Sequence, residues 1–280
     1  MKFTQTDITK IESKVFIKNE EHISYSLHRG ASTTQRPRIT LVHSLAMSRE
    51  FWQPVVDLLI QHADILTLDV RGHGDSTLSG GKYTAELFAD DIAALLTHIG
   101  WSSSAIAGAS MGGCISLAFA AKYPEKTQAL GMLDSTAWYG EDAALKWRER
   151  ADKALTGGMQ ALVDFQKTRW FSDSFRENNP SVVDRAVSIF KKTDVNAFAN
   201  TCQMMGDFDL RHSLAGLGVP TSILVGSEDY ATPIEMSELL HSHIAHSTMQ
   251  VIDKARHLTP IECPQIVCDA LVNLLAKSSP

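Results

Sequence analysis

Short apolar runs alternate along this chain with longer stretches in which apolar residues recur at helical spacing. The apolar runs predict strands at residues 14–18, 22–28, 38–42, 64–69, 104–109, 128–133, 221–226 and 248–253. The longer stretches predict amphipathic helices at 51–61, 84–98, 111–122, 234–243 and 264–276. The alternation is typical of an α/β fold with a mostly parallel, doubly wound sheet. The first two strands would form a hairpin that turns at residues 19–21, which gives the sheet an antiparallel start.

One interval, residues 136–207, breaks this rhythm because it contains no apolar strand-like run. It has the pattern of helices and is rich in large side chains, among them Trp138, Trp147, Met159, Phe165, Trp170 and Phe171. We interpret it as a helical cap inserted after the strand that ends at Asp134. Residues 1–135 and 208–280 would then form the α/β core, and 280 residues suffice for such a domain with a large insertion.

Composition is that of an ordinary soluble globular protein, with 44% hydrophobic and 21% charged residues. The net charge of −6, with no Lys/Arg-rich run, argues against nucleic acid and anionic membranes as partners. No segment is apolar for long enough to cross a membrane, and residues 1–10 lack the apolar core of a signal peptide. The four cysteines form no C-x-x-C pair, so we expect a cytoplasmic protein with reduced thiols. A homo-oligomer is compatible with these features.

The most informative motif lies at residues 108–112, which read Gly-Ala-Ser-Met-Gly and fit the G-x-S-x-G pattern of a nucleophile elbow. A predicted buried strand precedes it and an apolar helical stretch follows it, as the motif requires. The chain would turn sharply at Ser110, and the flanking glycines would let strand and helix approach closely. The turn would also place the Ser110 hydroxyl near the helix N-terminus, which favours negative charge. Taken alone, the pattern also fits an ordinary glycine-rich turn.

A serine becomes a nucleophile when a histidine, oriented by an acid, takes its proton. In strand–turn–helix folds of this kind the chain order is serine, acid, histidine. Asp229 follows the predicted strand at 221–226, and His257 lies in the loop after the last predicted strand. Open α/β sheets place their ligands at such loops. Two other carboxylates are rivals for the acid: Asp134, which also follows an apolar strand, and Glu228.

Acyl transfer also needs N–H groups directed at the oxyanion that develops on the substrate. The backbone N–H of Met111, directly after the serine, is one candidate. The N–H of Leu45, in the turn after the predicted strand at 38–42, is the other.

Two further patterns suggest ligand sites but have the wrong spacing. Residues 68–76 look like a nucleotide-binding loop, yet Thr77 stands where the third glycine belongs. The histidines within residues 241–246 lack the i, i+4 pairing of helical zinc motifs. We therefore expect no metal ion, no cofactor and a small-molecule substrate.

Five segments in chain order resemble the α/β-hydrolase superfamily, over about residues 38–275. They are His43–Trp52, Asp69–Ser76, Gly108–Gly113, Gly226–Pro233 and Ala255–Pro264. The resemblance implies the α/β-hydrolase fold with an inserted helical cap.

Within that superfamily the chain is most similar to the 3-oxoadipate enol-lactonases of aromatic catabolism. The similarity is carried by Ser44-Leu45-Ala46 with Trp52, by the R-W-F segment Arg169–Phe171, and by the blocks Gly226–Pro233 and His257–Pro264. Three positions depart from the usual enol-lactonase residues: His43 replaces Asn, Ala46 replaces Gly and Met111 replaces Leu. These departures lie on the expected floor of the pocket.

These motifs and the resemblance together imply a serine hydrolase that cleaves a small lactone or ester through an acyl-enzyme. Arg169 is then the candidate partner of a substrate carboxylate; the alternative is a surface arginine whose stem covers apolar cap residues. Further candidate substrate-binding residues are His43, Trp138 and Trp170.

Two other functions fit the same motifs. One is hydrolysis of a carbon–carbon bond in a ring-fission product, or a cofactor-free perhydrolase reaction. The other is a non-catalytic pocket that senses a ligand. Turnover of simple esters separates hydrolysis from sensing, and a panel of lactones and ring-fission dienes separates the two kinds of hydrolase.

Overall fold

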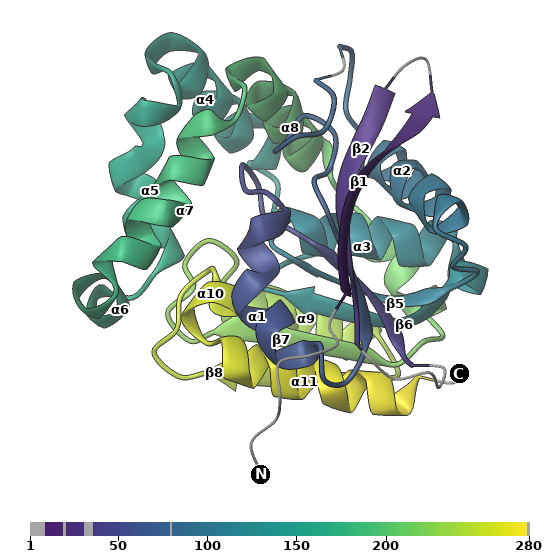
Figure 1. Ribbon diagram of the computed structural model, residues 1–280. Helices are drawn as coiled ribbons and strands as arrows, with labels where there is room; N and C mark the ends of the chain where they lie inside the picture. Colours follow the sequence, from purple (N-terminus) through teal and green to yellow (C-terminus); the bar gives the residue numbers. More distant parts are fainter. Residues whose placement is uncertain (1–8, 19–20, 31–35, 79, 279–280) are drawn as a thin grey trace.

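Eight strands form one sheet in the computed structural model, which describes residues 9–18, 21–30, 36–78 and 80–278 (Figure 1). The strands are β1 (Thr9–Lys18), β2 (Glu21–Arg29), β3 (Arg38–Val42), β4 (Asp64–Leu68), β5 (Ser104–Ala109), β6 (Thr127–Leu133), β7 (Thr221–Gly226) and β8 (Ser247–Ile252). Their order across the sheet is β1-β2-β4-β3-β5-β6-β7-β8. β1 and β2 pair antiparallel, as do β2 and β4, and all the pairs from β4 to β8 are parallel. The predicted mostly parallel sheet with an antiparallel start is therefore confirmed.

The hairpin at the start of the sheet differs in its ends from the prediction. β1 begins at Thr9, because its pairing with β2 extends to Thr9 opposite Arg29. Glu21, predicted in the turn, belongs to β2 and pairs with Lys18. The other two residues of the predicted turn, 19–20, lie outside the described residues.

Helices cover the two faces of the sheet, as a doubly wound fold requires (Figure 1). They are α1 (Gln53–Leu59), α2 (Ala85–His98), α3 (Met111–Lys122), α9 (Ile234–His243), α10 (Thr259–Glu262) and α11 (Pro264–Lys277). α1 packs against α11, and α11 lies along β6 and β7. α2 packs against α3, and α3 lies along β3, β5 and β6. None of the helices in the described part of the chain has the length and apolar character needed to cross a membrane.

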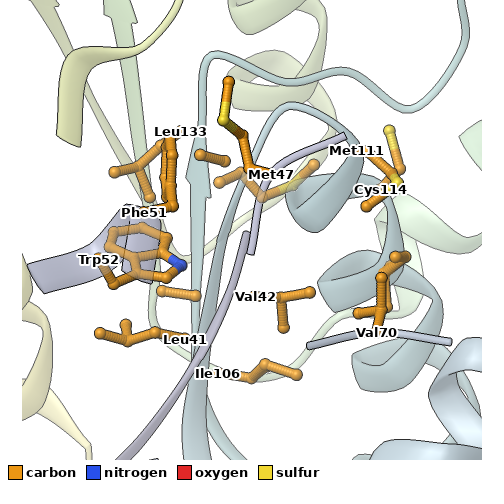
Figure 2. Close-up of a cluster of buried hydrophobic side chains, with 14 of the residues drawn as sticks. Leu41, Val42, Met47, Phe51, Trp52, Val70, Ile106, Met111, Cys114 and Leu133 are labelled. Atoms are coloured by element: carbon orange, nitrogen blue, oxygen red, sulfur yellow. The ribbon is translucent and has the colours of Figure 1, made fainter. Parts of the chain in front are cut away.

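The unit formed by β5 and α3 lies at the centre of the core. All residues of β5 are buried, and α3 is buried along nearly its whole length. Figure 2 shows Leu41 and Val42 of β3 and Ile106 of β5 in one cluster with Met111 and Cys114 of α3. Full burial of such side chains contributes roughly 1.5–3 kcal/mol each. The turn between β5 and α3 therefore rests on a closely packed base.

Between β6 and β7 the chain forms five α-helices. They are α4 (Ala143–Gly157), α5 (Val163–Trp170), α6 (Asp173–Asn178), α7 (Pro180–Lys192) and α8 (Val195–Asp207). We call them the insertion helices; they occupy the left side and the top of the molecule in Figure 1. α4 packs against α8, and α5 and α6 pack against α7. Aromatic rings join them: the ring centroids of Trp170 and Phe190 are 5.2 Å apart, and those of Phe190 and Phe198 are 6.0 Å apart.

Candidate active site

Ser110 occupies the turn from β5 into α3 and has φ +54° and ψ −119°. A non-glycine residue in such a conformation costs on the order of 1–3 kcal/mol, a strain that concentrates at functional sites. A Cβ atom at Gly108 would lie 2.0 Å from the Gly112 carbonyl oxygen, and one at Gly112 would lie 2.1 Å from the Val42 carbonyl oxygen. The two motif glycines are therefore required by close approach of the backbone. The predicted strand–turn–helix context of the motif is present.

A continuous line of hydrogen bonds joins Ser110, His257 and Asp229. The Ser110 Oγ lies 2.9 Å from His257 Nε2, and His257 Nδ1 lies 2.8 Å from Asp229 Oδ2. All three residues are buried, with 4–5% of their surface exposed. An ionised carboxylate only accepts hydrogen bonds, so the proton of the neutral imidazole belongs on Nδ1. Nε2 is then free to accept the Ser110 proton.

The carboxylate of Asp229 is held from two further sides. Its Oδ1 accepts the N–H groups of Ala231 and Thr232, at 2.7 and 3.1 Å, and its Oδ2 also accepts the Thr232 hydroxyl at 2.8 Å. Burial alone would raise the pKa of Asp229, but the charge and hydrogen bond of His257 and the bonds from Thr232 outweigh it. The net effect lowers the pKa below its ordinary value, so this carboxyl group is ionised at neutral pH.

The two rival carboxylates lie elsewhere. Asp134 accepts the N–H of Gly226 at 3.3 Å, and the N–H and hydroxyl of Thr259 at 3.0 and 2.7 Å. Burial and the nearby charge of Asp229 raise the pKa of Asp134 well above its ordinary value. Asp134 therefore joins the end of β7 to the start of α10, two residues after His257. Glu228 is exposed, with Oε2 3.5 Å from the Arg256 Nε.

The two candidate oxyanion donors both lie where their N–H groups are free. Met111 is the first residue of α3, and Leu45 lies in the turn after β3. Among the described residues, neither N–H has a hydrogen-bond acceptor. Ala46, next to Leu45, has φ +58°. This left-handed conformation is one that glycine adopts more easily than alanine does.

His43, a candidate for substrate binding, is completely buried under this turn. Its Nδ1 lies 2.8 Å from the Ser44 carbonyl oxygen, and its Nε2 accepts the Val70 N–H at 3.1 Å. Burial lowers the pKa of His43 to about 4, so the imidazole is neutral. Both ring nitrogens already have protein partners, which leaves only carbon atoms of the ring for contact with a ligand.

Two arginines of the insertion helices, Arg169 and Arg150, are without an acidic partner among the described residues. The Arg169 guanidinium carbon is 5.8 Å from the centre of the Phe165 ring, and that of Arg150 is 4.6 Å from the Trp147 ring. Burial, with the positive charge of Arg169 nearby, lowers the pKa of Arg150 to about 9. Burial also lowers the pKa of Arg169, against the opposing charge of Asp229.

Sequence reasoning missed Arg150, because nothing in the pattern separates it from Arg148 two positions earlier. Only the packing of α4 distinguishes the half-buried Arg150 from the exposed Arg148.

The two candidate tryptophans have packing contacts of their own. Trp170 is 2% exposed, and its ring meets those of Phe190 and Phe171 edge to face. Trp138 is half-buried beneath the Arg211 guanidinium, whose central carbon is 3.7 Å from the ring centre. Neither ring has a recorded contact with the serine, histidine or aspartate described above.

The described residues contain no group of three or more His, Cys, Asp or Glu side chains that could hold a metal ion. The histidines within residues 241–246 lie around the end of α9. There His241 bonds to the Ser247 hydroxyl, with 2.8 Å between Nδ1 and Oγ.

Residues 37–264 match the model of the α/β hydrolase fold family, and the chain belongs to this family. Among curated relatives, a 3-oxoadipate enol-lactonase of Acinetobacter baylyi is 31% identical over 230 residues, which cover 82% of this chain and 85% of the relative. An enol-lactonase of Burkholderia xenovorans superposes with a TM-score of 0.89 at 29% identity, covering 94% of this chain and all of that one. A thermophilic esterase of Thermogutta terrifontis, solved with malate bound, superposes with a TM-score of 0.86 at 27% identity, covering 96% and 98%. The similarity to enol-lactonases seen in the motifs thus extends over the whole fold.

Proposed function

We propose that this protein hydrolyses a small carboxylic ester or lactone through an acyl-enzyme formed on Ser110. The observation that carries the proposal is the buried line of hydrogen bonds from Asp229 through His257 to the Ser110 hydroxyl. The similarity to two enol-lactonases and an esterase supports the same reaction class.

In the proposed mechanism, Ser110 Oγ attacks the substrate carbonyl while His257 Nε2 takes its proton. Asp229 keeps the imidazole in the tautomer with a proton on Nδ1 and stabilises the imidazolium. The N–H groups of Leu45 and Met111 stabilise the negative oxygen of the tetrahedral intermediate. His257 then gives the proton to the leaving oxygen, which in a lactone stays attached to the acyl chain. Water, deprotonated by His257, releases the acid and restores the serine.

We further propose that the substrate carries a carboxylate, bound by Arg169 with Arg150 beside it. Partial burial of a guanidinium without an acidic partner costs free energy unless an anion pairs with it. The charges of both arginines act to lower the pKa of Tyr139, whose hydroxyl lies 3.6 Å from the sulfur of Cys114 in the first turn of α3. The charge of Asp229 in turn acts to raise the pKa of Arg169. These electrostatic effects support a place for the arginines on the side of the site that faces the insertion helices. The relatives named for 3-oxoadipate enol-lactone and the malate-bound esterase fit an anionic substrate.

The insertion helices would then serve as a cap over the site, with residues 136–207 forming the cap and residues 1–135 and 208–280 the hydrolase core. In this division the two tryptophans act mainly through packing. Trp170 packs against Phe190 and Phe171 and so holds its neighbour Arg169 in place, and Trp138 packs against Arg211. A role in the breakdown of aromatic compounds follows if the substrate is an enol-lactone.

A substrate screen tests the proposal. The panel contains short p-nitrophenyl esters, lactones with and without a carboxylate, and ring-fission dienes, with Ser110→Ala as the blank. We expect Ser110-dependent cleavage of esters or lactones and a preference for the carboxylate-bearing members. Cleavage of the dienes alone would point to a carbon–carbon hydrolase, and binding without any turnover would point to a ligand sensor.

A further inference from the structure

One segment of the insertion helices, residues 168–172, is joined to the loop of His257 by a dense set of hydrogen bonds. The Arg256 guanidinium donates to the carbonyl oxygens of Thr168 and Phe171, at 2.8 and 3.1 Å. The N–H of Leu258 donates to the carbonyl oxygen of Trp170 at 3.1 Å. Arg256 and Leu258 are the two chain neighbours of His257, so His257 is flanked by one residue bonded to this segment through its side chain and one bonded through its backbone.

Glu262 adds further hydrogen bonds between segment 168–172 and the loop of His257. Its Oε1 accepts both the N–H of Ser172, at 3.0 Å, and the Ser172 hydroxyl, while its Oε2 accepts the N–H of Arg256 at 3.0 Å. The carboxylate thus bridges the end of segment 168–172 to the residue before His257. Glu262 accepts every one of these hydrogen bonds, at both of its oxygens. A carboxylate can do this, whereas an amide has only one oxygen and an NH2 group that donates.

The residue that follows Asp229 also contacts segment 168–172. Tyr230, the residue after Asp229, has its hydroxyl 3.2 Å from the Thr168 hydroxyl. Arg169, the proposed partner of the substrate carboxylate, lies within the segment that carries all these bonds.

We propose that Glu262 and Arg256 are positioning residues that hold His257 and segment 168–172 in one frame. A substrate held by its carboxylate at Arg169 would then have its carbonyl placed against a general base whose position is set by the same backbone. A misplacement of about 1 Å costs on the order of 100-fold in rate, so a bridge of short, mainly charge-assisted bonds has a direct effect on catalysis. The inference rests on the proposed hydrolase function and adds residues that touch neither substrate nor Ser110.

The variant Glu262→Gln tests this role with little change of shape. Its NH2 group must face a backbone donor, either the Ser172 N–H or the Arg256 N–H, so one end of the bridge is lost. The matched control is Glu238→Gln, an exposed residue of α9. The measurements are the rate of the p-nitrophenol burst from p-nitrophenyl acetate, the KM, and the NMR chemical shift of the His257 Nδ1 proton, which reports its hydrogen bond to Asp229. We expect Glu262→Gln to slow the burst about tenfold or more with KM nearly unchanged, and the control to match the wild type. The Nδ1 proton signal should move upfield, since a looser contact with Asp229 weakens that hydrogen bond.

A purely structural Glu262 would lower the melting temperature and leave the burst rate and the His257 Nδ1 proton signal at their wild-type values, which would overturn the proposal. If Glu262→Gln does not give a native circular dichroism spectrum, Arg256→Gln decides. It removes the guanidinium bonds to Thr168 and Phe171 together with the ion pairs to the exposed Asp173 and Glu228, and it keeps the Arg256 N–H that Glu262 accepts. Wild-type protein with no Ser110-dependent cleavage of any ester or lactone in the panel would contradict the hydrolase function instead. The NMR measurement would still test the positioning role in that case, because it needs no turnover.

Discussion

Replacing Asp229 with asparagine should disable the base while leaving the fold in place. Asp229 Oδ1 accepts two backbone N–H groups, from Ala231 and Thr232. The asparagine oxygen must occupy this position, because its NH2 group would otherwise face two donors. The NH2 group is therefore directed at His257 Nδ1, which can only accept from it. The proton of the imidazole then moves to Nε2, and the atom that should take the Ser110 proton already carries one.

The size of the loss follows from that tautomer. In serine proteases with a Ser-His-Asp triad, the same Asp→Asn change lowers kcat about 10⁴-fold. This factor corresponds to about 5.5 kcal/mol of transition-state stabilisation. We expect a loss of that order on the best ester of the panel, measured as kcat at pH 7 to 8. The Thr232 hydroxyl can accept from the new NH2 group, so native circular dichroism should persist. Asp229→Asn with more than about a tenth of wild-type kcat would refute the assigned tautomer and the role of Asp229.

Four further outcomes are expected. Ser110→Ala should abolish the burst and lower turnover at least about 10³-fold, and a retained burst would exclude the acyl-enzyme. Gly112→Ala should destabilise the fold by about 1–3 kcal/mol or more in urea unfolding, because the new Cβ meets the Val42 carbonyl oxygen at 2.1 Å; an unchanged midpoint would contradict the close approach. His43 is neutral when folded, with a pKa of about 4, and an unfolded histidine titrates near 6.5. The unfolded state therefore binds more protons between these values, so stability should fall by about 3 kcal/mol as pH drops from 6.5 to 4, and His43→Asn should lose less. Arg169→Ala should cost about 1.5–3 kcal/mol in KM for a carboxylate substrate and almost nothing for a neutral ester; equal losses on both would assign Arg169 to packing.

The regular elements of the core were predictable from the chain because each depends on a local pattern. β5 is a continuous apolar run that ends at a glycine-rich turn, and α3 follows as an apolar helix. The predicted order serine, aspartate, histidine depends on the same local features, since each side chain follows a strand. The limits of β1 were harder to predict, because its first residues gain their structure from pairing with β2.

The choice of Asp229 over Asp134 was predicted from the sequence, although both follow buried parallel strands. Asp229 follows the strand nearest in sequence to the loop of His257 and lies in the block Gly226–Pro233. The tertiary structure supplies the contact that decides between them. In the fold, adjacent strands β6 and β7 deliver the two carboxylates to one region, and only Asp229 lies beside His257. Asp134 is instead surrounded by the donors of Gly226 and Thr259, which is a matter of distance between segments far apart in the chain.

The roles of Arg150 and Glu262 needed the tertiary structure. Arg150 stands in a stretch of ordinary helical composition, and Glu262, although it lies in the block His257–Pro264, meets Ser172 only when the insertion helices pack against the rest of the chain. By itself the sequence determined the strand and helix pattern, the turn at Ser110 and the chain order of the reactive side chains, because backbone propensity and apolar periodicity are local. The tertiary structure alone decided where Asp134 finds its hydrogen-bond donors, which arginines lie half-buried without an acidic partner among the described residues, and which residues attach the segment 168–172 to the loop of the base. Those outcomes depend on burial and on distances that arise only between residues brought together by folding.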